Sequence, residues 1–178
     1  ITPGFKEQGH KIAVLGSIKE DHKSFSGSEY LSTVHQIVSG DIRSADLELE
    51  KNIITLLGKG AKEGLFDSAQ SVGLGGLGVA LAKSCISGAP GANGAAIDLG
   101  SVPVSDQAGP ATRPDLVLFG EANSAVVVSF GSAKETAVME LCRAHNVPFH
   151  EIGHVTSDRL CVEFDRLSED GRPIDLEC

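Results

Sequence analysis

Apolar residues occur along the chain in two patterns, short continuous runs and stripes at helical spacing. The runs predict strands at residues 11–17, 65–72, 95–99, 126–130, 148–155 and 160–164. The stripes predict helices at residues 29–38, 46–63, 77–86 and 132–145. Asp46 can cap the second helix and Gly64 can end it, whereas Ser132 and Glu135 have the spacing of a capping box at the start of the last one.

The order of these elements predicts an α+β fold. Hairpin and crossover connections both occur, so we expect a mixed sheet covered by helices in one domain over residues 1–178. Residues 1–9 are polar and rich in turn residues, which is typical of a linker entered from something upstream, although processing or tag removal also explains a first residue other than Met. The segment 100–114 is expected to be a long polar loop, and the tail from Asp165 a charged peripheral segment.

Composition narrows the classes of function. A net charge of −9 argues against a broad surface for nucleic acid or for an anionic membrane. The sequence has no run of 18 apolar residues and no signal-peptide pattern. The four cysteines are widely spaced and belong to no local motif, so we interpret each as a small buried or incidental residue rather than a nucleophile, in a protein from a reducing cytoplasm.

Two motifs match known ligand sites literally. Residues 150–154 read HEIGH, but Pro148, Gly153 and the β-branched neighbours favour a strand, on which positions four apart lie about 13 Å apart and cannot share one zinc ion. Residues 73–78 read GLGGLG, a dinucleotide-binding pattern, but the segment before it is short and polar rather than an apolar central strand. A glycine turn at a helix start can hold an anion, and it can equally serve close packing.

Six segments in the same order resemble one family. They are GHKIAVLGS (9–17), SGSEYL (26–31), SADLELEKN (44–52), SAQSVGLGGLGVALAKSCISG (68–88), LFGEANSAVVVSF (118–130) and IGHVTSDRLCVEF (152–164). The fourth is similar to the SAHDVSDGGLAVALAE signature of C-terminal domains in the aminoimidazole ribonucleotide synthetase superfamily. Together the six most resemble the last domain of the phosphoribosylformylglycinamidine synthases, also called formylglycinamide ribonucleotide amidotransferases. Selenophosphate synthetases, thiamine-phosphate kinases and hydrogenase maturation proteins fit the other segments less well.

The resemblance implies a three-layer α/β/α domain, partly ferredoxin-like, that belongs to an ATP-dependent C–N ligase of de novo purine biosynthesis. Such enzymes use ATP, Mg²⁺ and glutamine-derived ammonia to convert a formamide into an amidine through an iminophosphate. ATP is bound largely by a separate N-terminal-type domain, and glutamine is hydrolysed by another unit. We therefore expect this chain to be inactive alone, to bind no cofactor strongly, and to have an upstream ATP-binding domain and a glutaminase unit as partners. The isolated domain is expected to self-associate through the face left exposed.

The chain departs from the family signature at positions that could face a ligand. The replacements are Gln70, Ser71, Gly73, Leu74, Lys83 and Ala125. They remove charge partners for phosphate or metal, so we predict no catalytic residue and no metal ligand in this chain. The residues expected to contact substrate or phosphate are Ser28, Glu29, Gly75, Gly76, Glu121 and Asn123. The altered signature keeps two alternatives open, a non-catalytic scaffold or interaction domain and, on GLGGLG, a dinucleotide-binding oxidoreductase.

Overall fold

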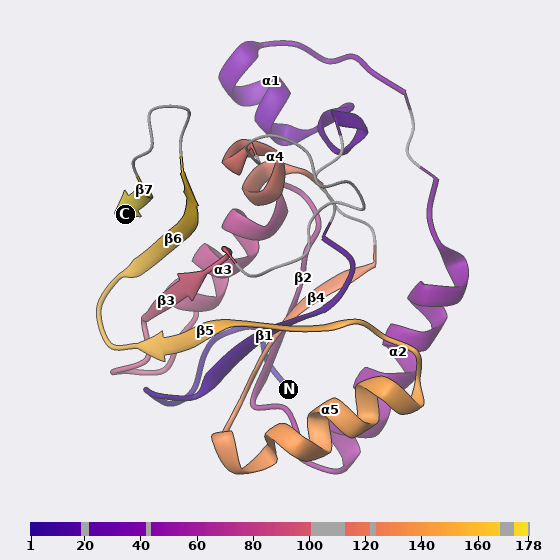
Figure 1. Cartoon of the computed structure of the whole chain (residues 1–178), viewed down its shortest axis with the longest axis vertical. Coiled ribbons are helices and arrows are strands. Elements are labelled where there is room, and N and C mark those ends of the chain that lie inside the picture. Colours follow the sequence, from indigo (N-terminus) through magenta and orange to yellow (C-terminus); the bar gives the residue numbers. More distant parts are fainter. Residues whose placement is uncertain (19–21, 42–43, 101–112, 122–123, 168–172, 178) are drawn as a thin grey trace.

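The fold is an α+β arrangement built around one mixed sheet (Figure 1). The structure is a computed structural model that describes residues 1–18, 22–41, 44–100, 113–121, 124–167 and 173–177. In chain order its elements are β1 (Lys11–Gly16), η1 (His22–Phe25), α1 (Glu29–His35), α2 (Leu47–Lys62), β2 (Ser68–Ser71), α3 (Gly76–Ile86), β3 (Gly94–Asp98), α4 (Pro114–Phe119), β4 (Ala125–Phe130), η2 (Ser132–Lys134), α5 (Glu135–Ala144), β5 (Phe149–Thr156), β6 (Leu160–Leu167) and β7 (Pro173–Glu177).

The strands lie in the order β2-β4-β1-β5-β3-β6-β7. Among the described strand pairs, only β3 and β6 are parallel, whereas the other neighbours run antiparallel. The mixed sheet is therefore confirmed. No helix in the described part of the chain is long and apolar enough to cross a membrane.

Helices cover both faces of the sheet, and β1 shows why. Ile12 and Val14 of this strand pack into a core with α3 and α4, whereas Ala13 and Leu15 pack into a second core with α2 and α5. Side chains alternate between the two faces of a strand, so a strand buried on both sides reads as the continuous apolar run found here. The three-layer architecture follows from this pattern.

Helix α2 begins and ends where the sequence predicts. The Leu49 N–H donates to the Asp46 carboxylate at 2.9 Å, which caps the first turn. At the other end Gly64 has a φ of 65°, and the N–H of Leu65 donates to the carbonyl of Gly60 at 2.8 Å. This is the left-handed glycine ending that satisfies the last carbonyls of a helix.

Several expected boundaries were wrong. Helix α1 ends at His35 rather than at residue 38, because Gln36 turns into the left-handed region with a φ of 56°. Ser132 begins a 3-10 turn and caps nothing with its side chain, so α5 begins only at Glu135. Helix α4 was not predicted, since six residues are too few to show a helical period, although Pro114 at its first position is a known start signal.

The two ends of the chain belong to the fold more closely than their polarity suggested. Phe5 is fully buried in the α3-side core, and Thr2 forms a parallel bridge with Ser68, so residues 1–9 are not a free linker. The tail is not merely peripheral either, because β6 continues to Leu167 and β7 pairs with it as the last strand of the sheet. The expected loop at 100–114 lies largely outside the described residues.

Candidate functional site

Three loops meet at one end of the sheet. Strand β4 runs antiparallel to β1 and β2, with Gly16 opposite Ala125 and Ser71 opposite Val126. The segments that leave β1 and β2 therefore lie beside the segment that enters β4. These three segments carry all six residues that the sequence nominates for ligand contact.

One carboxylate joins the three segments. Glu121 Oε1 accepts hydrogen bonds from the backbone N–H of Glu29 at 2.8 Å and of Gly75 at 3.1 Å. The Glu121 N–H in turn donates to the carbonyl of Ser24 at 2.9 Å. We call Ser28, Glu29, Gly75, Gly76 and Glu121 the Glu121 cluster. It contains five of the six predicted residues, whereas Asn123 lies outside the described residues.

Both amides that Glu121 holds lie at helix starts. Glu29 is the first residue of α1, and Gly75 is the N-cap of α3. Backbone N–H groups at a helix start have no partner within the helix, and the helix dipole favours negative charge there. Ser28, which is fully buried, accepts from the Leu31 N–H at 3.2 Å and so caps α1 with its own side chain.

The glycine turn is built for close packing. Gly75 and Gly76 have φ values of 82° and 72°, which side chains rarely tolerate. A Cβ on Gly76 would lie 2.6 Å from the carbonyl oxygen of Leu118, at the end of α4. The N–H of Gly76 donates to the carbonyl of Gly73 at 2.9 Å, and that of Gly75 is taken by Glu121. In this conformation both N–H groups are therefore satisfied within the chain.

An aromatic stack lies beside the Glu121 cluster, and sequence reasoning missed it. Tyr30 stacks between Phe25 and Phe119, with ring centroids 5.0 Å apart in each pair. Phe25 and Phe119 are 94 positions apart by their numbers, so no local pattern brings them together. The available signal was composition, because with 4% aromatic residues a Tyr in the retained SGSEYL segment is unusual.

Backbone strain marks the entry to β4. Ser124 has a φ of 70°, which costs a residue other than glycine about 1 kcal/mol. Its carbonyl accepts from the Ser17 N–H at 3.1 Å, and its buried hydroxyl has no hydrogen-bond partner among the described residues. Strained residues of this kind gather at functional sites.

The cysteines and histidines support a structural interpretation. Burial raises the pKa of Cys85 to about 11, and likewise that of Cys142, so both thiols stay protonated at neutral pH. His150 and His154 lie on strand β5, as the sequence predicts, and burial lowers the pKa of His150. Within the described ranges no three His, Cys, Asp or Glu side chains are grouped so that they could hold a metal ion.

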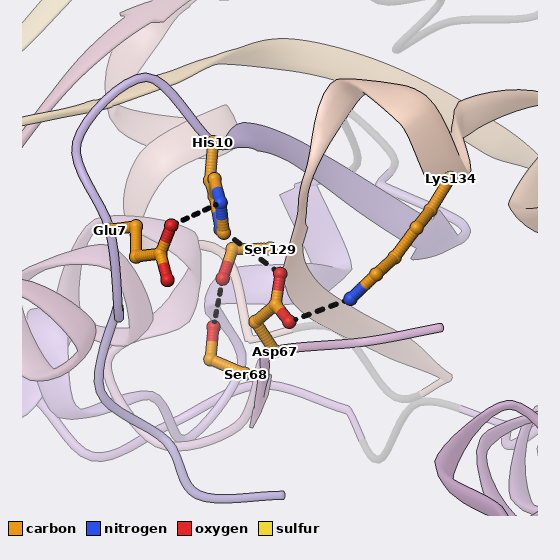
Figure 2. A network of polar contacts seen from close by, with 6 residues as sticks. All are labelled: Glu7, His10, Asp67, Ser68, Ser129 and Lys134. Carbon is orange, nitrogen blue, oxygen red and sulfur yellow. Dashed lines mark hydrogen bonds and ion pairs between the residues drawn. The ribbon is translucent and has the colours of Figure 1, made fainter. Parts of the chain in front are cut away.

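A second polar cluster lies at the opposite end of β1, β2 and β4 (Figure 2). Asp67 lies between Lys134 and His10, with Lys134 Nζ 2.9 Å from Oδ1 and His10 Nδ1 3.0 Å from Oδ2. The His10 contact is too poorly aligned for a hydrogen bond and is an ion pair when the imidazole is protonated. We call Glu7, His10, Asp67, Ser68, Ser129 and Lys134 the Asp67 cluster.

The Asp67 cluster ties strand ends together. Glu7 Oε2 lies 3.2 Å from His10 Nε2, and the buried hydroxyls of Ser68 and Ser129 lie 2.6 Å apart between β2 and β4. Sequence reasoning missed this cluster, because its members are scattered over four segments. Its side chains pair with one another across the ends of strands, so we interpret its role as structural.

The sheet rejects the dinucleotide-binding alternative. GLGGLG follows β2, which is an edge strand antiparallel to β4, whereas a dinucleotide fold places this turn after a central parallel strand.

The sequence is similar to proteins of a known family. Residues 7–164 match the family described as AIR synthase related protein, C-terminal domain. The chain is 35% identical over 159 residues to the phosphoribosylformylglycinamidine synthase subunit PurL of Thermomicrobium roseum, covering 89% of this chain and 20% of that protein. The chain thus spans about a fifth of the length of this relative.

Two solved structures share the fold. The Thermotoga maritima PurL complexed with FGAR has a TM-score of 0.76 and 21% identity, over 93% of this chain and 27% of that one. The same protein complexed with ATP has a TM-score of 0.71 and 19% identity, over 99% and 26%.

Proposed function

The chain belongs to the AIR synthase related protein C-terminal domain family, and we propose that it is one domain of an ATP-dependent phosphoribosylformylglycinamidine synthase. In the full enzyme, the formamide of the substrate would be activated by ATP and attacked by ammonia to give an amidine. The chain alone is proposed to be inactive, because the ATP-binding and glutaminase units that the resemblance implies are separate from it.

The observation that carries this proposal is the convergence at Glu121. Three segments that resemble the family separately are joined there by one carboxylate, through the amides of Glu29 and Gly75. We propose that the Glu121 cluster, with Asn123, forms this domain's share of a cleft with the ATP-binding domain. Substrate or phosphate would contact the outer edge of the cluster, since the N–H groups of Gly75 and Gly76 are already used inside it.

Among the described residues, the glycine turn and Glu121 do not form a fitting site for Mg²⁺ or for the phosphates of ATP. Mg²⁺ prefers carboxylate oxygens in octahedral geometry. At the glycine turn the signature's acidic positions are replaced by uncharged residues, among them Ser71 and Leu74, and Glu121 Oε1 already accepts two hydrogen bonds. We therefore place ATP and Mg²⁺ on the other domain, and no step of the reaction is assigned to a residue of this chain.

An ATP-binding domain would cover exposed apolar residues of the α1 segment and of the glycine turn. Val34 of α1, Val38 just after it and Leu74 of the glycine turn are 58%, 82% and 68% exposed. Large apolar side chains that stay exposed together often mark an interface. We propose the ATP-binding domain as the partner, because relatives of this chain are about five times its length. Without that domain, the same face is expected to make the isolated chain self-associate, which light scattering measures.

Complementation tests the proposal. The chain and the remaining polypeptide of the full-length protein would be produced separately, then assayed alone and mixed for ADP release with formylglycinamide ribonucleotide, ATP and ammonia. We expect turnover only in the mixture. Turnover by the chain alone, or by the remaining polypeptide at the same rate as the mixture, contradicts the proposal.

The altered signature supports a second candidate, a non-catalytic scaffold domain. Leu74 is exposed where the signature has a polar residue, and it can neither bind metal nor transfer a proton. In that case the mixture would form a complex by size-exclusion chromatography, yet no formylglycinamide ribonucleotide would bind in calorimetry. The first candidate requires both the complex and the binding.

A further inference from the structure

The segment 22–41, which we call the α1 arm, is buried at Ser24, Phe25 and Ser28, whereas the helix that follows lies on the surface. None of the residues of α1 is buried, and Figure 1 shows this helix at the outer end of the molecule with a long connection to α2. A seven-residue helix is too short to be stable by itself in water. What holds the arm in place must therefore come from its contacts with other elements.

Two kinds of contact stand out among the described residues. Tyr30 of the arm stacks on Phe119 at the end of α4, and Phe25 stacks on the other side of the tyrosine ring. The second contact is polar, since the Glu29 N–H donates to Glu121 Oε1, and the Ser24 carbonyl accepts from the Glu121 N–H. Glu121 is thus bonded to the arm through both its side chain and its backbone.

The same oxygen also holds the glycine turn. Gly75 donates to Glu121 Oε1 at 3.1 Å, although Gly75 and Glu29 belong to different helices 46 positions apart. Hydrogen bonds to a carboxylate are roughly twice as strong as those between neutral groups. An oxygen shared in this way makes the position of the arm depend on the position of the turn.

We propose that Glu121 is a positioning residue that couples the α1 arm to the glycine turn. While its carboxylate holds both amides, the arm is closed over the turn and the two move as one body. When the carboxylate is removed, or is displaced from the Gly75 amide by a competing group, the arm keeps its aromatic stack and the backbone hydrogen bond between Ser24 and Glu121, and the start of α1 moves away from the turn. This inference concerns the chain alone and does not depend on the proposed function.

Amide hydrogen exchange in the whole chain tests the coupling. In Glu121→Ala the amides of Glu29 and Gly75 are expected to exchange about tenfold faster, because each loses its acceptor in the same event. Glu121→Gln keeps a side-chain oxygen that can accept both bonds, so most of the protection should return. The amides of β4, such as Val127, are expected to stay protected and show that the domain remains folded.

Ser28→Ala is the matched control. It removes the hydroxyl that caps Leu31 within the arm, so exchange should rise in α1 while the Gly75 amide stays protected. If Glu121→Ala exposes only one of the two amides, or if Ser28→Ala exposes Gly75 to the same extent, the coupling is disproved. If Gln fails to restore protection of either amide, the assigned role of the Glu121 oxygen is wrong.

Tyrosine fluorescence provides a second readout, for variants whose β4 amides stay protected. Tyr30 is the single tyrosine and the chain has no tryptophan, so the signal reports on the arm directly. Acrylamide is expected to quench it more strongly in Glu121→Ala than in the wild type or in Glu121→Gln. Equal quenching in all three proteins would mean that the Glu121 side chain does not hold the arm, and would overturn the proposal.

Discussion

Two polar clusters lie at opposite ends of β1, β2 and β4, and they differ in what they hold together. The Asp67 cluster joins side chains to side chains, with Asp67 between Lys134 and His10 and two buried serines beside it (Figure 2). The Glu121 cluster joins one side chain to backbone amides of two helices. Paired side chains can be replaced by another pair without a change of the backbone. The hydrogen bonds of Glu121, in contrast, are made to backbone amides and depend on the conformation of the loops.

The two ends also differ in backbone conformation. Gly75, Gly76 and Ser124 at the Glu121 end have positive φ values, whereas the positive φ beside the Asp67 cluster belongs to a glycine, Gly9. Of these four residues, only Ser124 is not a glycine. A left-handed conformation persists only where surrounding contacts enforce it. The difference indicates that the Asp67 cluster stabilises the sheet. The Glu121 cluster instead holds loops in a fixed conformation, which a partner or ligand could bind.

The largest effect is expected from Gly76→Ala at the Glu121 end. The new Cβ would lie 2.6 Å from the Leu118 carbonyl oxygen and 2.8 Å from that of Gly120, at a φ of 72°. Steric overlap and the left-handed backbone together should lower the free energy of unfolding by about 3 kcal/mol. Urea unfolding followed by circular dichroism measures it.

Gly73→Ala is the control for that variant. A Cβ there would meet nothing within 4 Å, and the residue has no positive φ. Its unfolding free energy should stay within about 0.5 kcal/mol of the wild type. Equal losses in the two variants would show that the turn is merely intolerant of side chains, and the close approach to α4 would not be the cause.

A smaller loss is expected at the other end from Asp67→Asn. Asp67 is 19% exposed and faces both Lys134 and His10, so the neutral amide leaves the Lys134 ammonium without its counter-charge and weakens the contact with His10. We expect the free energy of unfolding to fall by about 2 kcal/mol, between the values typical of exposed and of buried pairs. The amide protection of Glu29 and Gly75 should not change, since both lie at the opposite end of the sheet.

Lys134→Met separates the two partners of Asp67. Lys134 is 37% exposed, so its loss should cost less than about 1 kcal/mol in the same unfolding assay. A cost as large as that of Asp67→Asn would assign the cluster's stability to the lysine alone. It would also mean that His10 does not contribute to the free energy of unfolding.

The sequence predicted the elements that carry a strong local signal. The caps of α2, the run of β4 and the mixed order of strands and helices are all local patterns, and each was confirmed. Resemblance to the family also nominated Glu121, and the structure brings it together with the other described candidates. Whether these residues contact a ligand stays a prediction.

What sequence reasoning missed depends on contacts between distant residues. The stack of Tyr30 on Phe119 and the pairs around Asp67 join segments that no periodicity connects. Strand β7 was missed because its sequence, PIDLE, is short and half charged or proline, and it becomes a strand only by pairing with β6. The interpretation of the N-terminal segment as a linker was wrong, because the burial of Phe5 holds this segment against the core although its neighbours are polar.

The smallest effect, of opposite sign, is expected from Ser124→Gly. Glycine adopts a φ of 70° freely, so the strain of the serine should be relieved and the free energy of unfolding should rise by about 1 kcal/mol. Ser124→Ala is the control, because it removes the buried hydroxyl but keeps the strain. If the alanine variant gains as much as the glycine variant, the buried hydroxyl is the source of the cost. If only the glycine variant has a higher free energy of unfolding, the cost lies in the backbone conformation of Ser124. The two ends of the sheet then differ in main-chain strain and not only in their side chains.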